Sequence, residues 1–136
     1  MKLLLDTHVL IWLVEGLDEL RLEPRQAIEA ASCTGGIAVS SVTFWEVAML
    51  AARGRIHLRR PAAVWRDEVL ALPGVSEIPL SGDVAVEAVH LPGSFHADPA
   101  DRFLVATARA HGMHLVTRDS RIIAYGDAGH VATVPV

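Results

Sequence analysis

The feature that most constrains the fold of this chain is a set of short, largely apolar runs separated by helical segments. A strand that lacks polar alternation is buried on both faces, which is typical of parallel sheets covered by helices. The pattern therefore predicts an α/β fold. The expected strands are Lys2–Leu5, Ile37–Val39, Val75–Leu80, His114–Thr117 and Val131–Val134.

Helix start and stop signals occupy the intervals between these strands. Ser, Thr or Asp precedes several of the helical segments, and Pro or Gly lies at many of their boundaries. Thr43 and Glu46 have the spacing of a capping box, in which each side chain bonds the backbone of the other. The expected helices are Thr7–Glu15, Pro24–Ser32, Thr43–Arg53, Pro61–Leu72, Ser81–Leu91, Asp98–His111 and Ser120–Ala124.

Length and composition narrow the class of protein. A chain of 136 residues is expected to form one domain, residues 1–136. Its 51% hydrophobic and 21% charged residues exclude a disordered chain. Cys33 is the single cysteine, which excludes an internal disulfide or a cysteine-rich zinc site. No segment approaches the ~18 apolar residues of a membrane helix. We expect a cytoplasmic protein without membrane association.

Five carboxylates fall just after predicted strands or at predicted helix starts: Asp6, Glu46, Asp98, Asp101 and Asp119. Each has a local explanation, because acids commonly cap helices or complement their dipoles. In a parallel sheet, however, these positions converge at the carboxyl ends of the strands. Crowded carboxylates repel one another, and Mg²⁺ or Mn²⁺ relieves this because both ions prefer oxygen ligands. The set therefore indicates a metal site suited to phosphodiester hydrolysis.

Four segments that carry these acids resemble, in order and spacing, the motifs of PIN-domain nucleases, most nearly the VapC-type toxins of bacterial toxin–antitoxin pairs. They are Leu3–His8, Val39–Glu46, His96–Ala108 and Leu115–Asp119. The resemblance implies a three-layer α/β/α sandwich with a mainly parallel sheet. It also implies a Mg²⁺- or Mn²⁺-dependent endoribonuclease that cleaves an RNA substrate, an antitoxin that blocks its site, and a homodimer.

The resemblance also assigns roles to the acids. Asp6, Glu46, Asp101 and Asp119 match the four acids of the family, and Asp98 belongs to a variant motif found in part of it. We expect Asp6, Asp101 and Asp119 to hold the metal ion and Glu46 to position or deprotonate the attacking water. Whether Asp98 is a ligand or only a helix cap stays open.

Other residues are candidates for supporting roles. Thr7 and Thr117 match hydroxyl positions beside the family's acids and could orient them or a water. Arg102 and Arg118 flank acids and could hold phosphate or pair with those acids. Arg53 and Arg55 belong to a local basic patch that could bind RNA, although a solvated helix end explains that patch equally well. Core or surface roles are expected for the histidines, and His96 is singled out because it lies beside Asp98.

Two other functions remain open. An aspartyl phosphatase or phospho-acceptor could use Asp6 as a nucleophile. The usual phosphatase pattern, however, has a second Asp where this chain has His8, and a receiver domain needs a late Lys where this chain has only Lys2. A non-catalytic regulatory partner is the third possibility. The intact set of acids favours an enzyme over it, because like charges are costly to crowd together.

Overall fold

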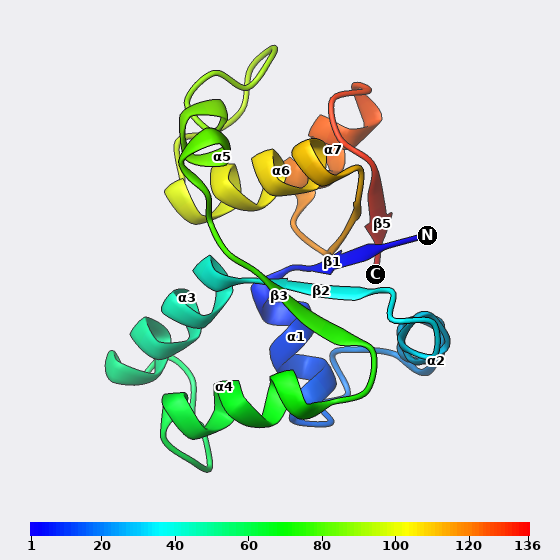
Figure 1. Ribbon diagram of the computed structural model, residues 1–136, viewed down its shortest axis with the longest axis vertical. Coiled ribbons are helices and arrows are strands. Elements are labelled where there is room, and N and C mark those ends of the chain that lie inside the picture. The colour runs from blue at the N-terminus through cyan, green and yellow to red at the C-terminus, as the bar shows by residue number, and fades with distance from the viewer.

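The computed structural model describes residues 1–136 and has a central sheet with helices on both faces (Figure 1). All neighbouring strands are parallel. The strands lie in the order β3-β2-β1-β4-β5 and span Leu3–Leu5 (β1), Ile37–Ser40 (β2), Val75–Ile78 (β3), His114–Thr117 (β4) and Thr133–Pro135 (β5). The expected three-layer α/β/α sandwich is therefore confirmed, and its sheet is parallel throughout.

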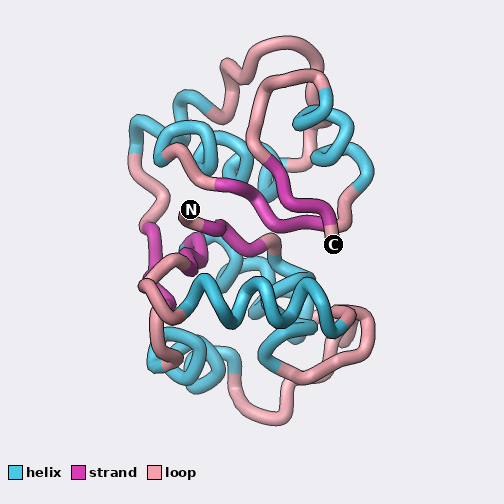
Figure 2. Tube along the Cα trace, turned by 90° about the vertical axis from the view of Figure 1, so that its right-hand side faces the viewer, coloured by secondary structure: helices cyan, strands magenta, loops and turns pink.

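Seven helices form the two outer layers. Helices α5, α6 and α7 lie on one side of the sheet and α1 to α4 on the other, and Figure 2 shows the strands between the two groups. None of the helices is both long enough and apolar enough to cross a membrane. Their bounds are Thr7–Val14 (α1), Leu22–Ser32 (α2), Ser41–Ala52 (α3), Ala62–Ala71 (α4), Gly82–Glu87 (α5), Pro99–His111 (α6) and Ser120–Asp127 (α7).

The uniform apolarity of β1 follows from its central place in the sheet. Leu3 and Leu5 belong to the core cluster that includes Val9 of α1, whereas Leu4 belongs to the cluster that includes Leu104 of α6. Successive side chains of a strand point to opposite faces, so both faces of β1 are buried. A polar residue within this strand would lose its hydration on either face.

The order of the strands places a crevice at the end of β1. From β1 the chain continues to β2 on one side, and β4 later pairs with β1 on the other side. Such a switch point is where open parallel sheets bind ligands, beyond the carboxyl ends of the strands. In the β1–β4 register Leu5 lies opposite Val116. Asp6 follows Leu5 and Thr117 follows Val116, so these two residues meet at this edge of the sheet.

The predicted capping box at Thr43 is wrong. Helix α3 begins at Ser41, and the Ser40 side chain caps it by accepting a hydrogen bond from Val42 N at 3.1 Å. Strand β2 runs directly into the helix, so no loop separates them and the cap falls on the last residue of the strand. Glu46 consequently lies in the second turn of α3, where its carboxylate does not serve as a cap.

The helix predicted from Ser81 also ends earlier than expected, at Glu87 rather than Leu91. Side-chain hydrogen bonds replace the missing helical turn. The guanidinium of Arg102 donates to the carbonyl oxygens of Ala88 and Val89, at 2.8 and 3.3 Å. Carbonyls satisfied in this way do not need a further turn of helix.

The last two elements are displaced from their predicted bounds. Helix α7 extends to Asp127 instead of Ala124, because Tyr125 is buried in the core beneath it. The last strand is Thr133–Pro135 rather than Val131–Val134. The remaining elements agree with the predictions to within about two residues, the usual uncertainty of element ends.

Candidate active site

Asp6 caps helix α1 and lies at the crevice at the same time. Its Oδ1 accepts a hydrogen bond from Thr7 N, and its Oδ2 accepts one from the Thr117 hydroxyl, both at 2.7 Å. Burial raises the pKa of the Asp6 carboxyl, and the hydrogen bonds from Thr117 and Thr7 partly offset that rise. The Asp6 carboxylate can therefore cap helix α1 and take part in the site without changing its position.

Asp98 and Asp101 stand together at the start of α6. Asp98 is the N-cap and accepts a hydrogen bond from Asp101 N at 3.2 Å. The pKa of Asp101 is raised to about 7, mainly by burial and further by the charges of the other acids, first Asp6, then Asp98, Asp119 and Glu46. At neutral pH its carboxyl is thus poised between the protonated and ionised forms.

Asp119 caps α7, and the pKa of its carboxyl is lowered. Its Oδ1 accepts hydrogen bonds from Arg121 N at 2.8 Å and Ile122 N at 3.1 Å. Burial raises the pKa of Asp119, but the bonds from Ile122 and Arg121 outweigh it and the net shift is downward. Asp119 N in turn donates to the Thr117 hydroxyl at 3.0 Å, so Thr117 links Asp119 to Asp6.

Glu46 reaches the same region from α3. Burial raises the pKa of its carboxyl, and the charges of Asp6 and Asp98 raise it further, while the Thr7 hydroxyl and His8 lower it. Thr7 is fully buried, 3.5 Å from the hydroxyl of Thr43. A carboxyl with a raised pKa is a suitable proton acceptor near neutral pH.

All five predicted carboxylates line one pocket of about 290 Å³. They come from four separate parts of the chain, the ends of β1 and β4 and the helices α3 and α6. The expectation that distant acids would converge is therefore met by the geometry. The pocket is lined by Asp6, Glu46, Asp98, Asp101 and Asp119, together with His8, Val9, Trp12, Arg118 and Arg121.

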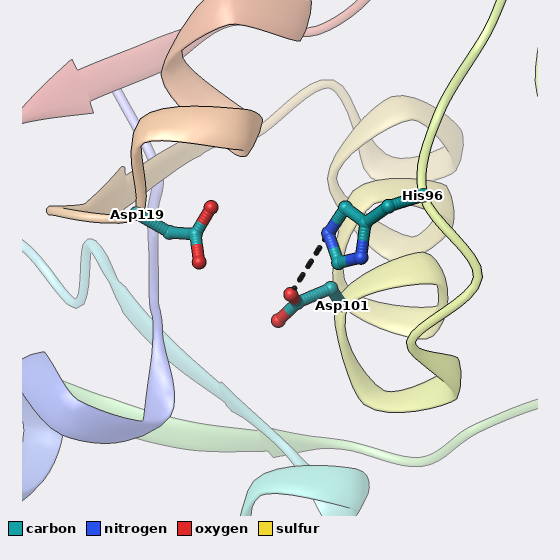
Figure 3. A group of neighbouring side chains, drawn as sticks. All are labelled: His96, Asp101 and Asp119. Carbon is teal, nitrogen blue, oxygen red and sulfur yellow. Dashed lines mark ion pairs between the residues drawn. The ribbon is translucent and has the colours of Figure 1, made fainter.

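His96 lies beside two of the acids, Asp101 and Asp119, although the sequence indicated only that it is near Asp98. Ligand atoms of His96, Asp101 and Asp119 lie within 4.8 Å of one another, and Figure 3 shows the three side chains facing a common space. His96 Nε2 lies 3.0 Å from Asp101 Oδ2. That nitrogen is buried and makes no hydrogen bond of normal geometry. Burial, followed by the charge of Arg121, lowers the pKa of His96, which favours the neutral, ligating form.

The predicted arginines divide into two groups. Arg118 lines the acid pocket, where its guanidinium lies 4.5 Å from the centre of the Trp12 ring and donates to the backbone carbonyls of Val136 and Glu19. Arg102 does not face the acids, because its guanidinium donates to backbone carbonyls, including those of Phe95 and His96. The expectation that Arg102 would hold phosphate or pair with the acids is therefore not met, because its guanidinium binds backbone carbonyls instead.

Arg53 and Arg55 lie in the turn after α3 and are not among the residues that line the acid pocket. Arg121, in contrast, was not singled out from the sequence. Its guanidinium lies 3.4 Å from Asp119 and 3.9 Å from Asp101. An Arg two residues after an acid that caps a helix is the signal that could have identified it.

The donors present fit a hard divalent cation. Carboxylate oxygens are the preferred ligands of Mg²⁺ and Mn²⁺, and a neutral imidazole is an acceptable additional ligand for Mn²⁺. Burial and the charges of the neighbouring acids raise the pKa of Asp101, and the buried Nε2 of His96 has no hydrogen-bond partner. A divalent ion bound here would offset the repulsion between the acids and give that nitrogen a partner.

A parallel sheet with an acid pocket at its switch point can hold a metal ion that acts on a phosphate ester. The PIN domain family model matches residues 3–128, and the chain belongs to the PIN-domain family. It is similar to Ribonuclease VapC22 of Mycobacterium tuberculosis, with 40% identity over 119 residues that cover 88% of each chain.

Solved structures agree with this membership. A toxin–antitoxin complex from Klebsiella pneumoniae contains a chain with 28% identity and a TM-score of 0.61, over 90% of this chain and 91% of that one. VapBC2 from Rickettsia felis, crystallised with a promoter DNA fragment, aligns with a TM-score of 0.72 over 99% of this chain and 98% of that one. The identity of 15% in the latter case supports the fold alone.

Proposed function

We propose that this chain is a Mg²⁺- or Mn²⁺-dependent endoribonuclease and that it acts as the toxin of a toxin–antitoxin pair. The observation that carries the proposal is the convergence of five carboxylates in one pocket of a chain that is 40% identical to a VapC ribonuclease. Residues 1–136 would form one catalytic domain. We expect it to act in the cytoplasm, where its RNA substrate is found.

Asp6, Asp101 and Asp119 are the proposed metal ligands. A bound divalent ion would neutralise charge on the phosphate oxygens and make a nearby water more acidic. The protein's own contribution is to hold these carboxylates close together before any ion arrives. Thr117 fixes Asp6 through its hydroxyl, and the N–H groups of Arg121 and Ile122 fix Asp119.

Glu46 is proposed to accept the proton of the attacking water. Its raised pKa suits a general base, and it lines the same pocket from α3. Asp98 caps α6 and contributes negative charge to the pocket. We propose that Asp98 positions Asp101, because its carboxylate accepts a hydrogen bond from the backbone N–H of Asp101.

Cationic side chains at the pocket would hold the RNA backbone. Arg118 and Arg121 line the pocket, and we propose that both contact phosphate oxygens of the RNA. Arg53 and Arg55 do not line the pocket, so they would contact the RNA only away from the cleaved bond. Thr7 supports the site by donating its backbone N–H to Asp6.

The proposed protein partners are an antitoxin and a second copy of the chain. The solved relatives include toxin–antitoxin complexes, which supports an antitoxin partner here. Large apolar side chains are exposed on α3, on α5 and just after α5: Trp45 is 58% exposed, Val86 59% and Val89 71%. Both helices pack against α6. Exposed apolar groups on neighbouring elements commonly mark an interface, and we propose that this one forms the homodimer.

The function is tested by measuring RNA cleavage with the purified chain, with Mg²⁺ or Mn²⁺ and after chelation. We expect cleavage only with the ion, and we expect Asp6→Asn to reduce it at least about 100-fold while the protein stays folded. Asp18→Asn, an exposed acid outside the pocket, is the matched control. Cleavage by Asp6→Asn at the wild-type rate would refute the assignment.

A further inference from the structure

Beside the acid pocket the structure has a second hollow, of about 500 Å³. It lies between the loop that precedes α6 and helix α7. None of the residues that line it is acidic, so its charge differs from that of the neighbouring pocket. Its main lining residues are Phe95, His96, Arg121, Ala124, Tyr125 and His130.

Four aromatic rings follow one another along this hollow. The ring centres of His96 and Phe95 are 4.4 Å apart, those of Phe95 and Tyr125 4.8 Å, and those of Tyr125 and His130 4.7 Å. Tyr125 is buried and supports the other rings, while Phe95 and His130 are half-buried. The row therefore offers aromatic surface that begins at the candidate metal group and leads away from it.

The outer end of this row is held in place by its surroundings. The backbone of Gly93 has φ +66°, and a Cβ added there would lie 2.8 Å from His130 Nε2. The imidazole is thus seated directly against the loop. The Arg109 side chain also donates to the His130 carbonyl. A ring fixed before binding loses little further conformational freedom when a ligand stacks on it.

Two residues connect the hollow to the acid pocket. Arg121 lines both, with its guanidinium 3.4 Å from Asp119. His96 lines the hollow and also faces Asp101. A polymer with a phosphate at the acids would therefore pass Arg121, and its neighbouring unit would reach the aromatic row.

We propose that this hollow is a subsite for one unpaired nucleobase of the RNA, adjacent to the phosphodiester that is cleaved. The proposal rests on the proposed ribonuclease function. The volume lies in the range of small-ligand sites, and aromatic faces bind the flat faces of all four bases. Phe95 and His130 provide the stacking surface, and Arg121 binds the phosphate that joins this nucleotide to the next. Single-stranded RNA is the form that such a subsite selects, because only its bases are free to stack on protein.

The test uses short single-stranded RNAs that the wild-type protein cleaves, each with one nucleotide near the cut bond replaced by an abasic ribose. We expect one flanking position at which loss of the base raises KM about tenfold with little change in kcat. Binding of the same RNAs to Asp6→Asn protein, followed by fluorescence anisotropy, should show the same dependence without turnover.

Variants then locate the base in the hollow. Ala124 is exposed on α7 and lines the hollow, so Ala124→Glu adds bulk and negative charge without disturbing the core. This variant should raise KM for intact RNA about tenfold and lose its sensitivity to the abasic position. Phe95→Ala should behave likewise. Ala110→Glu, the same change at an exposed position of α6 outside both hollows, should resemble the wild type.

The outcomes separate the two proposals. If the wild-type protein neither binds nor cleaves RNA, the proposed function fails and the subsite fails with it. If RNA is cleaved but no abasic position matters, the subsite alone is refuted. It is also refuted if Ala124→Glu stays as sensitive to base removal as the wild type.

Discussion

The Thr117 hydroxyl donates a hydrogen bond to Asp6 Oδ2 at 2.7 Å and so joins two residues 111 positions apart in the chain. The same hydroxyl accepts a hydrogen bond from Asp119 N at 3.0 Å. One fully buried Thr therefore sets the positions of two proposed metal ligands. The parallel pairing of β1 with β4 brings these residues together, since Asp6 and Thr117 follow the paired residues Leu5 and Val116.

Replacing this hydroxyl should impair cleavage more than it impairs folding. Thr117→Val keeps the shape but removes both hydrogen bonds, and we expect an activity loss of about 10–100-fold and a stability loss of about 1–3 kcal/mol. Thr117→Ser retains the hydroxyl and should keep most of the activity. Steady-state cleavage and denaturant unfolding measure the two effects. Wild-type turnover by Thr117→Val would show that this hydroxyl does not orient the site.

The metal-free protein should lose stability as the pH rises toward neutrality. The folded-state pKa of Asp101 is raised from 3.8 to about 7, so between these values the folded state binds more protons than the unfolded state. Stability then falls with increasing pH across that window. The upward shifts of Asp6 and Glu46 act in the same direction, and the downward shift of Asp119 opposes them.

Thermal unfolding in the presence of a chelator, between about pH 4.5 and 7.5, measures this dependence. Asp101→Asn should be more stable than the wild type near neutral pH and show a flatter profile. Added Mg²⁺ should stabilise the wild type most at the upper end of the range, because the ion binds the ionised carboxylates. A chelated wild-type protein whose stability rises steadily across this range would contradict the assigned electrostatics.

His96 should contribute to metal affinity. Its buried Nε2 lies beside Asp101 and has no hydrogen-bond partner, so we expect His96→Ala to weaken Mn²⁺ binding by about 10–100-fold. Calorimetric titration of Mn²⁺ into chelator-treated protein gives the affinity. His111→Ala, an exposed histidine at the end of α6, provides the comparison. Equal affinities for the two variants would remove His96 from the ligand set.

An acidic substitution on α3 should separate the proposed dimer. Trp45 is 58% exposed, and a buried interface Trp commonly contributes more than about 2 kcal/mol to association. We therefore expect Trp45→Glu to be monomeric at concentrations where the wild type is dimeric. Leu22→Glu, at an exposed apolar residue of α2, should leave the dimer intact. Sedimentation equilibrium decides this, and an unchanged dimer in Trp45→Glu would exclude the α3 surface as the interface.

The parts of the fold that could be predicted are those in which burial and local signals agree. Leu3–Leu5 is apolar throughout because both of its faces are covered, and Asp98-Pro99 starts α6 as its cap and first residue. The Thr43 signal failed because β2 continues without a loop into α3, so Ser40 became the cap. Local spacing carries no information on where the preceding strand ends.

Part of the site could also be predicted from the sequence, because its acids follow recognisable strands or begin recognisable helices. Acids at the carboxyl ends of parallel strands lie along the same edge of the sheet, so the five carboxylates could be grouped before the topology was known. Their convergence in one pocket depends on the strand order, which places β1 between β2 and β4. The position of His96 depends on how the loop before α6 folds back, and Arg102 shapes that loop by binding its carbonyls. Long-range contacts of this kind leave no periodic signal, and for that reason His96 was not placed in the site.

The most direct measurement of the central claim is anomalous diffraction at the manganese edge from crystals of the RNA-cleaving protein grown with Mn²⁺. We expect a peak among the carboxylates of Asp6, Asp101 and Asp119, and the loss of both this peak and cleavage in Asp6→Asn. A protein that cleaves RNA with Mn²⁺ bound elsewhere, or with no ion in this pocket, would contradict it.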